Sequence, residues 1–325
     1  MQSNALRAVY VATAFSLFAA EVGAAADSPL IIGLVAKSQS NPVFQAAYAG
    51  ARDAARELGP KYGVEVRIDW QTPPDEDAQK QAEAIEQLAR GGARGIAVAC
   101  SDANTVTPAI DKAVQLGVIV VCFDSDAPRS KRLCYYGTDD EVCGQKVMGE
   151  LAAAMDGKGK VAILAGNQTA PNLQRRVKAA REELAKHAEM ALVPDGVFYH
   201  PETPEQAVEA VNAAQSTNPE IGGWCMVGGW PLFTKNALKW PAGTVKVVAV
   251  DALPAQLSYL ESGHVQALYA QDCYGWGYKS VELLLEKIVK GNAPQSERII
   301  DPLIKVTKEN ASEFRTKWDK WLSKP

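Results

Sequence analysis

Short apolar segments alternate with amphipathic segments along the chain after residue 30. The apolar segments show no regular polar alternation, while stretches such as "DAQKQAEAIEQLARGG" place apolar residues at the three- and four-residue spacing of a helix. Apolar runs joined by helices are typical of parallel strands buried on both faces of a sheet. The predicted strands span residues 31–36, 64–69, 95–100, 118–123, 160–165, 195–200, 222–227 and 245–250.

The second half of this pattern repeats the first. Strands that start at 31, 95 and 118 correspond to strands that start at 160, 222 and 245, at offsets of 129, 127 and 127 residues. Asp124 and Asp251 follow corresponding strands and are also 127 residues apart. We therefore predict an α/β protein with two similar, doubly wound parallel-sheet lobes. The segment 268–276, "LYAQDCYGW", is expected to be a strand that returns between the lobes and places Gln271 near the hinge.

The first 26 residues have a different pattern. One early cation, Arg7, precedes an apolar stretch of about a dozen residues, and three alanines precede Asp27. This order predicts a cleavable secretory signal peptide over residues 1–26 and a soluble, exported mature protein. A membrane anchor is the weaker alternative, because the apolar run is short and Glu21 interrupts it. No cysteine lies near the expected cleavage point, which argues against a lipid anchor.

Charge and cysteine content exclude several classes of partner. The net charge of −4, the pI near 5.6 and the lack of a basic tract argue against nucleic-acid binding. The six cysteines include no C-x-x-C pair and the three histidines are scattered, so no metal site is predicted. Cys134 and Cys143 flank a strand-to-helix junction, and an exported protein could bond them. The spacing alone leaves that disulfide open.

Candidate binding residues lie where the predicted strands end. Ligands of open parallel sheets bind beyond the carboxyl ends of the strands, and clefts between domains are common ligand sites. For a single aspartate, capping of the next helix is an equal alternative, and Phe44 could belong to the core. The candidates at this shared edge are Lys37, Asn41, Phe44, Ser101, Asp102, Asp124, Ser125, Asn172, Gln174, Trp230, Asp251 and Gln271.

These residue types suit a neutral polyol. Carboxylates accept strong hydrogen bonds from hydroxyl groups, and the side-chain amides of Asn and Gln both donate and accept. An aromatic face such as Trp230 can cover the C–H side of a sugar ring. The chain lacks the G-x-G-x-x-G, G-x-S-x-G, Walker and H-E-x-x-H motifs, so we expect neither catalysis nor a cofactor. A repressor effector domain would instead need a helix-turn-helix before the first strand.

Several segments together resemble the ribose-type periplasmic sugar-binding proteins, the solute receptors of bacterial ABC importers. They are "NPVF", "GIAVACSDANTVTPAIDKAV", "VIVVCFDSDAP", "RLCYYGTDDEVCGQ", "VVAVD" and "LYAQ". The resemblance implies the type I periplasmic binding fold, a monomeric periplasmic receptor, and lobes that close on a sugar before docking on the permease. It also implies crossings near 137, 271 and 300. The lobes would then be 27–137 plus 272–300 and 138–271 plus 301–325, with the amphipathic tail on the second lobe.

The same resemblance assigns sugar contacts to Asn41, Phe44, Asp124, Asp251 and Gln271. The chain departs from ribose receptors at Ser125, where they carry arginine, and near Gln174 and Gly228, where they carry a second arginine and an asparagine. The missing guanidinium groups argue against ribose itself. Lys37 and the "DSD" at 124–126 resemble autoinducer-2 and rhamnose receptors, so a signalling or chemotaxis receptor is the alternative output.

Overall fold

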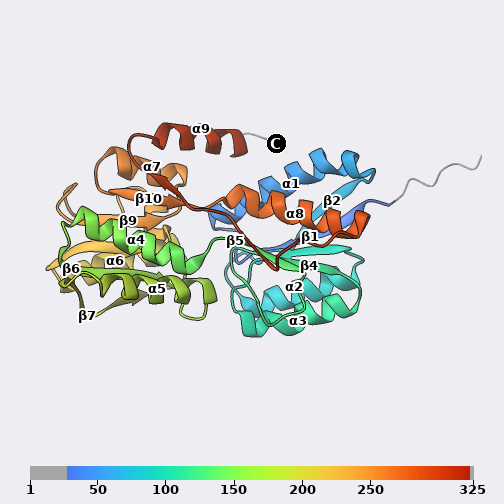
Figure 1. Cartoon of the computed structure of the whole chain (residues 1–325), viewed down its shortest axis with the longest axis horizontal. Helices are drawn as coiled ribbons and strands as arrows, with labels where there is room; N and C mark the ends of the chain where they lie inside the picture. Colours follow the sequence, from blue (N-terminus) through green and yellow to red (C-terminus); the bar gives the residue numbers. More distant parts are fainter. Residues whose placement is uncertain (1–27, 323–325) are drawn as a thin grey trace, which may run out of the picture.

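The computed structural model describes residues 28–322 as two lobes that lie side by side (Figure 1). Each lobe is built on its own six-stranded sheet. The strand order is β2-β1-β3-β4-β5-β11 in one lobe and β7-β6-β8-β9-β10-β12 in the other, so the first five strands of each have the same order. The predicted fold class and the tandem repeat are confirmed. The predicted signal peptide, residues 1–26, lies outside the described residues.

The N-terminal lobe has a fully parallel sheet with helices on both faces. α1 (Pro42–Tyr62) and α8 (Cys273–Lys290) pack together on one face, and α2 (Ala78–Arg90) and α3 (Ala103–Gln115) cover the other (Figure 1). Its apolar strands are buried because both faces are covered. The strands are β1 (Leu30–Val35), β2 (Val66–Trp70), β3 (Gly95–Val98), β4 (Ile119–Phe123), β5 (Cys134–Gly137) and β11 (Arg298–Ile300).

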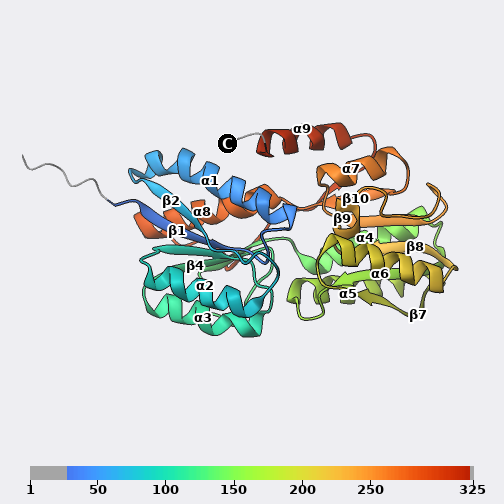
Figure 2. The same ribbon diagram turned by 180° about the vertical axis from the view of Figure 1, so that it is seen from behind.

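The C-terminal lobe repeats this arrangement, with one antiparallel edge strand, β12, beside β10. α4 (Asp140–Ala154) and α5 (Pro171–Leu184) pack together, and α6 (Pro204–Thr217) lies on the opposite face, in front in Figure 2. α7 (Pro254–Glu261) and the short helix η1 (Trp230–Phe233) complete the lobe. The strands are β6 (Lys158–Gly166), β7 (Glu189–Tyr199), β8 (Ile221–Met226), β9 (Lys246–Val250), β10 (Ala267–Ala270) and β12 (Ile304–Val306).

The chain passes between the two sheets three times: after β5, after β10, and between β11 and β12. The prediction of one strand over 268–276 was wrong. β10 ends at Ala270 and pairs with β9 and β12 in the C-terminal sheet. Asp272 then caps α8 through the backbone N–H of Gly275, and α8 covers the N-terminal lobe. Gln271 therefore lies at a crossing, between a strand of one lobe and a helix of the other.

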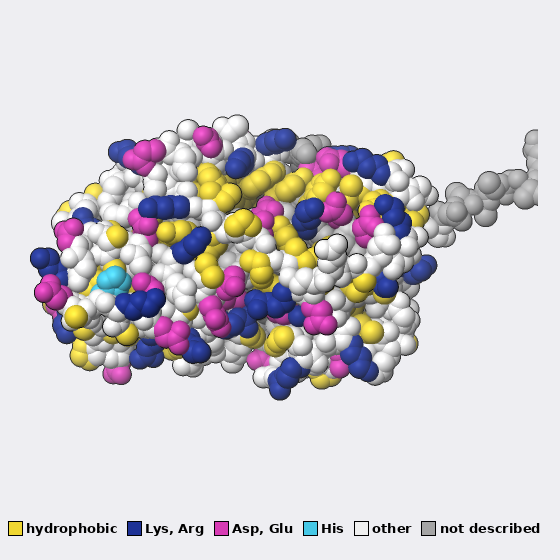
Figure 3. All heavy atoms as spheres, in the orientation of Figure 1, with side chains coloured by type: hydrophobic (Ala, Val, Ile, Leu, Met, Phe, Trp, Pro, Cys, Tyr) yellow, Lys and Arg dark blue, Asp and Glu magenta, His cyan; other side chains and the backbone are white. Residues whose placement is uncertain are grey.

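The C-terminal helix α9 (Ala311–Leu322) bridges both lobes, whereas we expected it to pack on the second lobe. Phe314 belongs to the core of the C-terminal lobe, but Trp318 belongs to that of the N-terminal lobe. The Trp318 indole also donates to the carbonyl of Ala252, at 2.7 Å. Trp321 stacks on Tyr274 of α8 with ring centroids 5.2 Å apart. Figure 3 shows apolar side chains gathered where α9 meets α8.

Cys134 and Cys143 are free thiols, so the disulfide that the sequence left open is not formed. Cys134 lies on β5 in the core of the N-terminal lobe, whereas Cys143 lies on α4 in the core of the C-terminal lobe. The first crossing separates the two residues, and each thiol is buried as a small apolar group of its own core.

The surface shows mixed charge. On the face in Figure 3, Lys and Arg side chains are interspersed with Asp and Glu over both lobes. Among residues 28–322, no helix is both long and apolar enough to cross a membrane.

A glycine sets the close approach of α1 and α8. A Cβ atom at Gly277 would lie 1.7 Å from the carbonyl oxygen of Ala47, which is backbone and cannot rotate away. The two helices therefore touch backbone to backbone, and they bring the aromatic ring of Trp276 onto the N-terminal core.

We expect Gly277→Ala to push α8 away from α1. Forced overpacking of this kind costs about 1–3 kcal/mol, so Tm should fall by several degrees. Thermal unfolding followed by circular dichroism measures the change. Gly149→Ala in α4 is the matched control, because its Cβ would make only an ordinary contact, 3.6 Å from Glu183. That control should be neutral or slightly more stable. Equal Tm values for the two variants would contradict the packing argument.

Candidate ligand site between the lobes

A small cavity of about 30 Å³ lies between the two lobes. A buried water molecule occupies roughly 10–15 Å³ on this measure, so the cleft is contracted to the size of a few waters. Both lobes and the crossing after β10 supply its walls. The lining residues are Lys37, Asn41, Val43, Phe44, Asp124, Asn172, Leu173, Arg176, Glu202, Gly228, Trp230, Asp251, Gln271 and Trp276.

The loop after β1 and the first turn of α1 present four of these residues from the N-terminal lobe: Lys37, Asn41, Val43 and Phe44. Asn41 caps α1, and its Oδ1 accepts a hydrogen bond from the Val43 N–H at 3.2 Å. Pro42 follows as the first helical residue, where its missing N–H costs nothing. The cap fixes the start of the helix and so fixes Phe44, which packs 6.1 Å from the ring of Trp276. Asn41 itself also lines the cleft.

Asp124 and Asp251 occupy equivalent turns in the two lobes. Each follows a central strand, and each has a left-handed backbone, with φ of 54° and 70°. Their N–H groups donate to the next strand of the sheet, at 3.3 Å to Tyr136 O and 2.9 Å to Tyr269 O. Aspartate tolerates this conformation better than most residues, and such strain concentrates at functional sites. The turn directs both carboxylates into the cleft.

The amide of Gln271 links Asp251 to Arg176. Gln271 Nε2 donates to Asp251 Oδ1 at 2.8 Å, and Arg176 Nη2 donates to Gln271 Oε1 at 2.7 Å. Across the cleft, Asn172 of α5 donates to Asp124 Oδ1 at 3.5 Å. The site thus offers carboxylate, amide and guanidinium groups from both lobes beside aromatic rings.

Lys37 and Glu202 form a buried ion pair between the lobes. Lys37 Nζ lies 3.5 Å from Glu202 Oε1, and the two side chains are 2% and 8% exposed. Burial lowers the pKa of Lys37, but the carboxylates of Glu202, Glu76 and Asp124 outweigh burial and hold that pKa above its ordinary range. Lys37 is therefore charged at neutral pH and holds the lobes together electrostatically.

Burial raises the pKa of Asp124 and Asp251, which line the cleft, and of Glu76, which interacts with Lys37 and Glu202. For Asp124, burial outweighs the attraction of Lys37 and Arg176 and raises the pKa to about 6. Burial and the neighbouring Glu202 raise the pKa of Glu76 to about 7, although Lys37 opposes them. The pKa of Asp251 is also raised by burial, and the hydrogen bond from Gln271 limits the rise.

The structure brings most of the predicted residues to the cavity but not all. Lys37, Asn41, Phe44, Asp124, Asn172, Trp230, Asp251 and Gln271 line it. Asp102 caps α3 instead, accepting from the Thr105 N–H at 2.7 Å. Ser101 is buried beside Gln81, which accepts its backbone N–H. Ser125 is fully buried behind the aspartate turn, and Gln174 also stands outside the lining.

Arg176, Glu202 and Trp276 line the cleft and were missed. A guanidinium does reach the cleft, because Arg176, two residues beyond Gln174, lines it and is 2% exposed. Glu202 follows β7 at its carboxyl end, so the rule that selected the other candidates applies to it too. Trp276 lies in the first turn of α8, a segment that was expected to be a strand.

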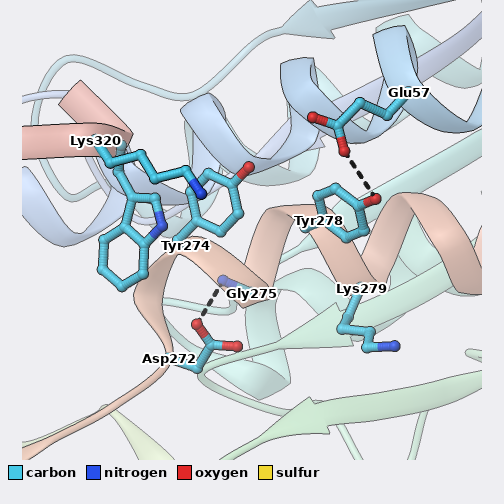
Figure 4. Close-up of a pocket in the computed structure, with 8 residues that line it drawn as sticks. Glu57, Asp272, Tyr274, Gly275, Tyr278, Lys279 and Lys320 are labelled. Carbon is cyan, nitrogen blue, oxygen red and sulfur yellow. Dashed lines mark hydrogen bonds between the residues drawn. The ribbon is translucent and has the colours of Figure 1, made fainter. Parts of the chain in front are cut away.

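A larger cavity of about 340 Å³ lies outside the cleft, among α1, α8 and α9 (Figure 4). Several of its polar groups already have partners in the protein: the Tyr278 hydroxyl donates to Glu57 at 3.2 Å, and the Gly275 N–H donates to Asp272 at 2.9 Å. No buried polar group of this cavity converges on a common point. The cleft has both convergence and raised carboxyl pKa values, so we assign the ligand site to the cleft despite its smaller volume.

Comparison with known proteins identifies the family. A family model described as a periplasmic binding protein domain matches residues 32–293, and the chain belongs to this family. Its fold and the relatives below are those of binding proteins, and the chain is a binding protein rather than an enzyme.

Two curated relatives match most of the chain. The D-ribose/D-allose-binding protein of Pseudomonas aeruginosa is 25% identical over 311 residues, which is 91% of this chain and 94% of that one. The D-apiose import binding protein of Actinobacillus succinogenes is 24% identical and covers 87% of this chain and 90% of its own. A solved ABC transporter solute-binding protein of Burkholderia graminis, in complex with D-arabinose, matches with a TM-score of 0.79. It is 26% identical over 86% of this chain and 96% of that one.

The raised pKa of Asp124 predicts a pH-dependent difference between the protein and Asp124→Asn. An acid whose pKa rises from 3.8 to about 6 on folding contributes stability below pH 4, and that stability is lost as the pH rises through 6. The asparagine variant loses nothing over this range. We expect the variant to gain roughly 2–3 kcal/mol relative to the unaltered protein between pH 4 and pH 7.5.

Urea unfolding at the two pH values, without ligand, measures this difference. Asp75→Asn, a change at an exposed carboxylate, is the control. Its free energy of unfolding, relative to the unaltered protein, should be nearly the same at the two pH values. A constant difference between Asp124→Asn and the unaltered protein at both pH values would mean that Asp124 is not buried in the folded state in solution.

Proposed function

We propose that the chain is an exported receptor that binds a monosaccharide or sugar-like polyol in the cleft and delivers it to the permease of an ABC importer. The observation that carries the proposal is the convergence of Asp124 and Asp251 from equivalent turns of the two lobes. Each carboxylate can accept hydrogen bonds from sugar hydroxyl groups, and the two approach a ligand from opposite sides. The two curated relatives and the arabinose complex support this function.

The proposed ligand contacts extend the predicted set by three residues. Arg176 and Glu202 add a donor and an acceptor, and the rings of Phe44, Trp230 and Trp276 supply faces for the C–H side of a sugar. A ligand that lacks one hydroxyl group, or has it in the other configuration, would leave a buried polar group without a hydrogen-bond partner. The cleft can therefore discriminate between epimers. We propose Lys37, Asn41, Phe44, Asp124, Asn172, Arg176, Glu202, Trp230, Asp251, Gln271 and Trp276 as contacts.

Delivery requires the lobes to move. A cavity of about 30 Å³ holds no more than a few water molecules, so the lobes must separate to admit a sugar. Contacts to both lobes, including the Lys37–Glu202 pair, favour the closed form once a ligand is bound. The closed form is the one that would dock on the permease. Export through a signal peptide over residues 1–26, periplasmic location and a monomeric state stay predictions.

A signalling receptor for an autoinducer-2-like ligand, or a chemotaxis receptor, is the second candidate. The buried position of Lys37 in the cleft favours it, because the sequence resembles such receptors at this lysine. Uptake of a radiolabelled ligand by cells with and without the gene separates the two outputs. Binding without importer-dependent uptake would favour signalling.

A thermal-shift screen tests the binding proposal. Purified protein is heated with D-allose, D-ribose, D-arabinose, other hexoses, deoxysugars, polyols and autoinducer-2. A ligand at a hundred times its Kd should stabilise the protein by ~2.7 kcal/mol, a shift of a few degrees. Asp124→Ala and Asp251→Ala should abolish that shift.

Asp102→Ala is the matched control for this screen. Asp102 also follows a strand of the sheet but caps α3 outside the cleft, so its loss should lower stability by about 1 kcal/mol and leave the ligand shift intact. A ligand shift that survives Asp124→Ala and Asp251→Ala, or no shift with any sugar or polyol, would overturn the proposed site or the proposed ligand class.

A further inference from the structure

We propose that Asp140, which does not line the cleft, is a positioning residue that orients Gln271 and Asp251 for the ligand through Arg176. The expected change in ligand affinity rests on the proposed function. The orientation of Gln271 by Asp140 and Arg176 does not. Asp140 is the first residue of α4, and its side chain is fully buried. It follows the first crossing between the lobes, behind the wall of the cleft.

Both carboxylate oxygens of Asp140 are held by arginines of α5. Oδ1 accepts from Arg176 Nε at 3.0 Å, and Oδ2 accepts from Arg175 Nη2 at 2.7 Å and Arg175 Nε at 3.2 Å. Arg176 is nearly as buried as Asp140, whereas Arg175 is 31% exposed. The buried Arg176 cation therefore has its principal counter-ion outside the cleft, and an unpaired buried charge would be costly.

Each terminal nitrogen of Arg176 also donates one hydrogen bond, which leaves one further N–H on each of them. Nη1 donates to the carbonyl of Val227 at 3.1 Å, and Nη2 donates to Gln271 Oε1 at 2.7 Å. Because the guanidinium is planar and its donors have a fixed geometry, acceptors at Asp140, Val227 and Gln271 define its plane. Asp140 holds the side of the group that faces away from the ligand.

The position of Arg176 determines the orientation of the Gln271 amide. A donor at Nη2 requires the oxygen of Gln271 to face Arg176, so its NH₂ must face the other way. There it donates to Asp251 Oδ1 at 2.8 Å. The relay from Asp140 through Arg176 and Gln271 thus occupies Oδ1 of Asp251, a residue that lines the cleft.

Charge at Asp140 also keeps Arg176 from collapsing onto the ligand-binding carboxylates. Asp124 and Asp251 line the same small cavity as Arg176, and their negative charges attract its guanidinium. Without a counter-ion behind it, the guanidinium would pair with one of them and occupy an oxygen meant for a sugar hydroxyl.

The packing of α4 on α5 makes the contact possible. Gly144 lies one helical turn beyond Asp140, and a Cβ there would be 2.1 Å from the carbonyl oxygen of Arg176. The two backbones therefore touch at Gly144, which brings the short Asp140 side chain within reach of the guanidinium.

Asp140→Asn tests the proposal, because it keeps the shape of the side chain and removes its charge. Asp139→Asn is the matched control: it removes the same charge one residue earlier, and asparagine caps α4 as well as aspartate does. The first readout needs no ligand. The side-chain NH₂ signals of Gln271, assigned by their loss in Gln271→Met, should move and exchange faster with solvent in Asp140→Asn only.

The second readout is the Kd of the sugar that gives the largest thermal shift among D-allose, D-ribose and D-arabinose. Loss of an orienting partner should weaken binding by about 10-fold in Asp140→Asn, and Asp139→Asn should bind as the unaltered protein does. Asp140→Asn and Gln271→Ala should be less than additive in a double-mutant cycle, since both break the same relay.

A purely structural role would lower Tm without moving the Gln271 signals or Kd, and that result would overturn the proposal. If Asp140→Asn does not fold, Asp140→Glu keeps the charge and misplaces it, and the Gln271 signals must then move while those of Asp139→Glu do not. If none of the sugars binds the unaltered protein, the sugar assignment fails, and the Gln271 signals still decide the relay.

Discussion

The cleft depends on the compensation of buried negative charge. Asp124, Asp251 and Glu202 would each be costly in isolation, because a charge loses its hydration on burial. Each meets a cation or an amide: Lys37 faces Glu202, and Gln271 donates to Asp251. Lys37 and Asn172 lie in the lobe opposite to their carboxylate partners, so Glu202 and Asp124 have these partners only when the lobes are close. Asp251 is compensated within its own lobe, through Gln271 and Arg176.

Parallel strand pairing makes this arrangement possible. In each sheet the strands that precede the site residues are parallel, so their carboxyl ends lie at the same edge. Because the fold is repeated, the two lobes present two such edges to each other. The equivalent turns at Asp124 and Asp251 show the repeat at the level of single residues, down to the N–H group that each donates to the neighbouring strand.

Much of the fold could be predicted from the sequence because buried parallel strands leave a strong apolar signal. The sequence also predicted which residues follow a strand end. It did not predict the direction in which their side chains point. Asp102 and Asp124 both follow strands, yet one caps a helix and the other enters the cleft, since only Asp124 has the left-handed backbone. Glu202 was missed although β7 ends just before it, and Asp140 has no sequence signal at all, because its role arises from packing between α4 and α5.

The path of the chain has a consequence for the order in which the protein can form during synthesis. Residues 30–137 leave the ribosome first, but helix 273–290, edge strand 298–300 and Trp318 complete their core only after the whole second lobe has been made. After Ala270, the chain contributes little more to the second lobe than strand 304–306 and the side chain of Phe314. The N-terminal lobe is therefore completed after the C-terminal lobe, and a nascent chain lacks a complete N-terminal core until Trp318 has been synthesised.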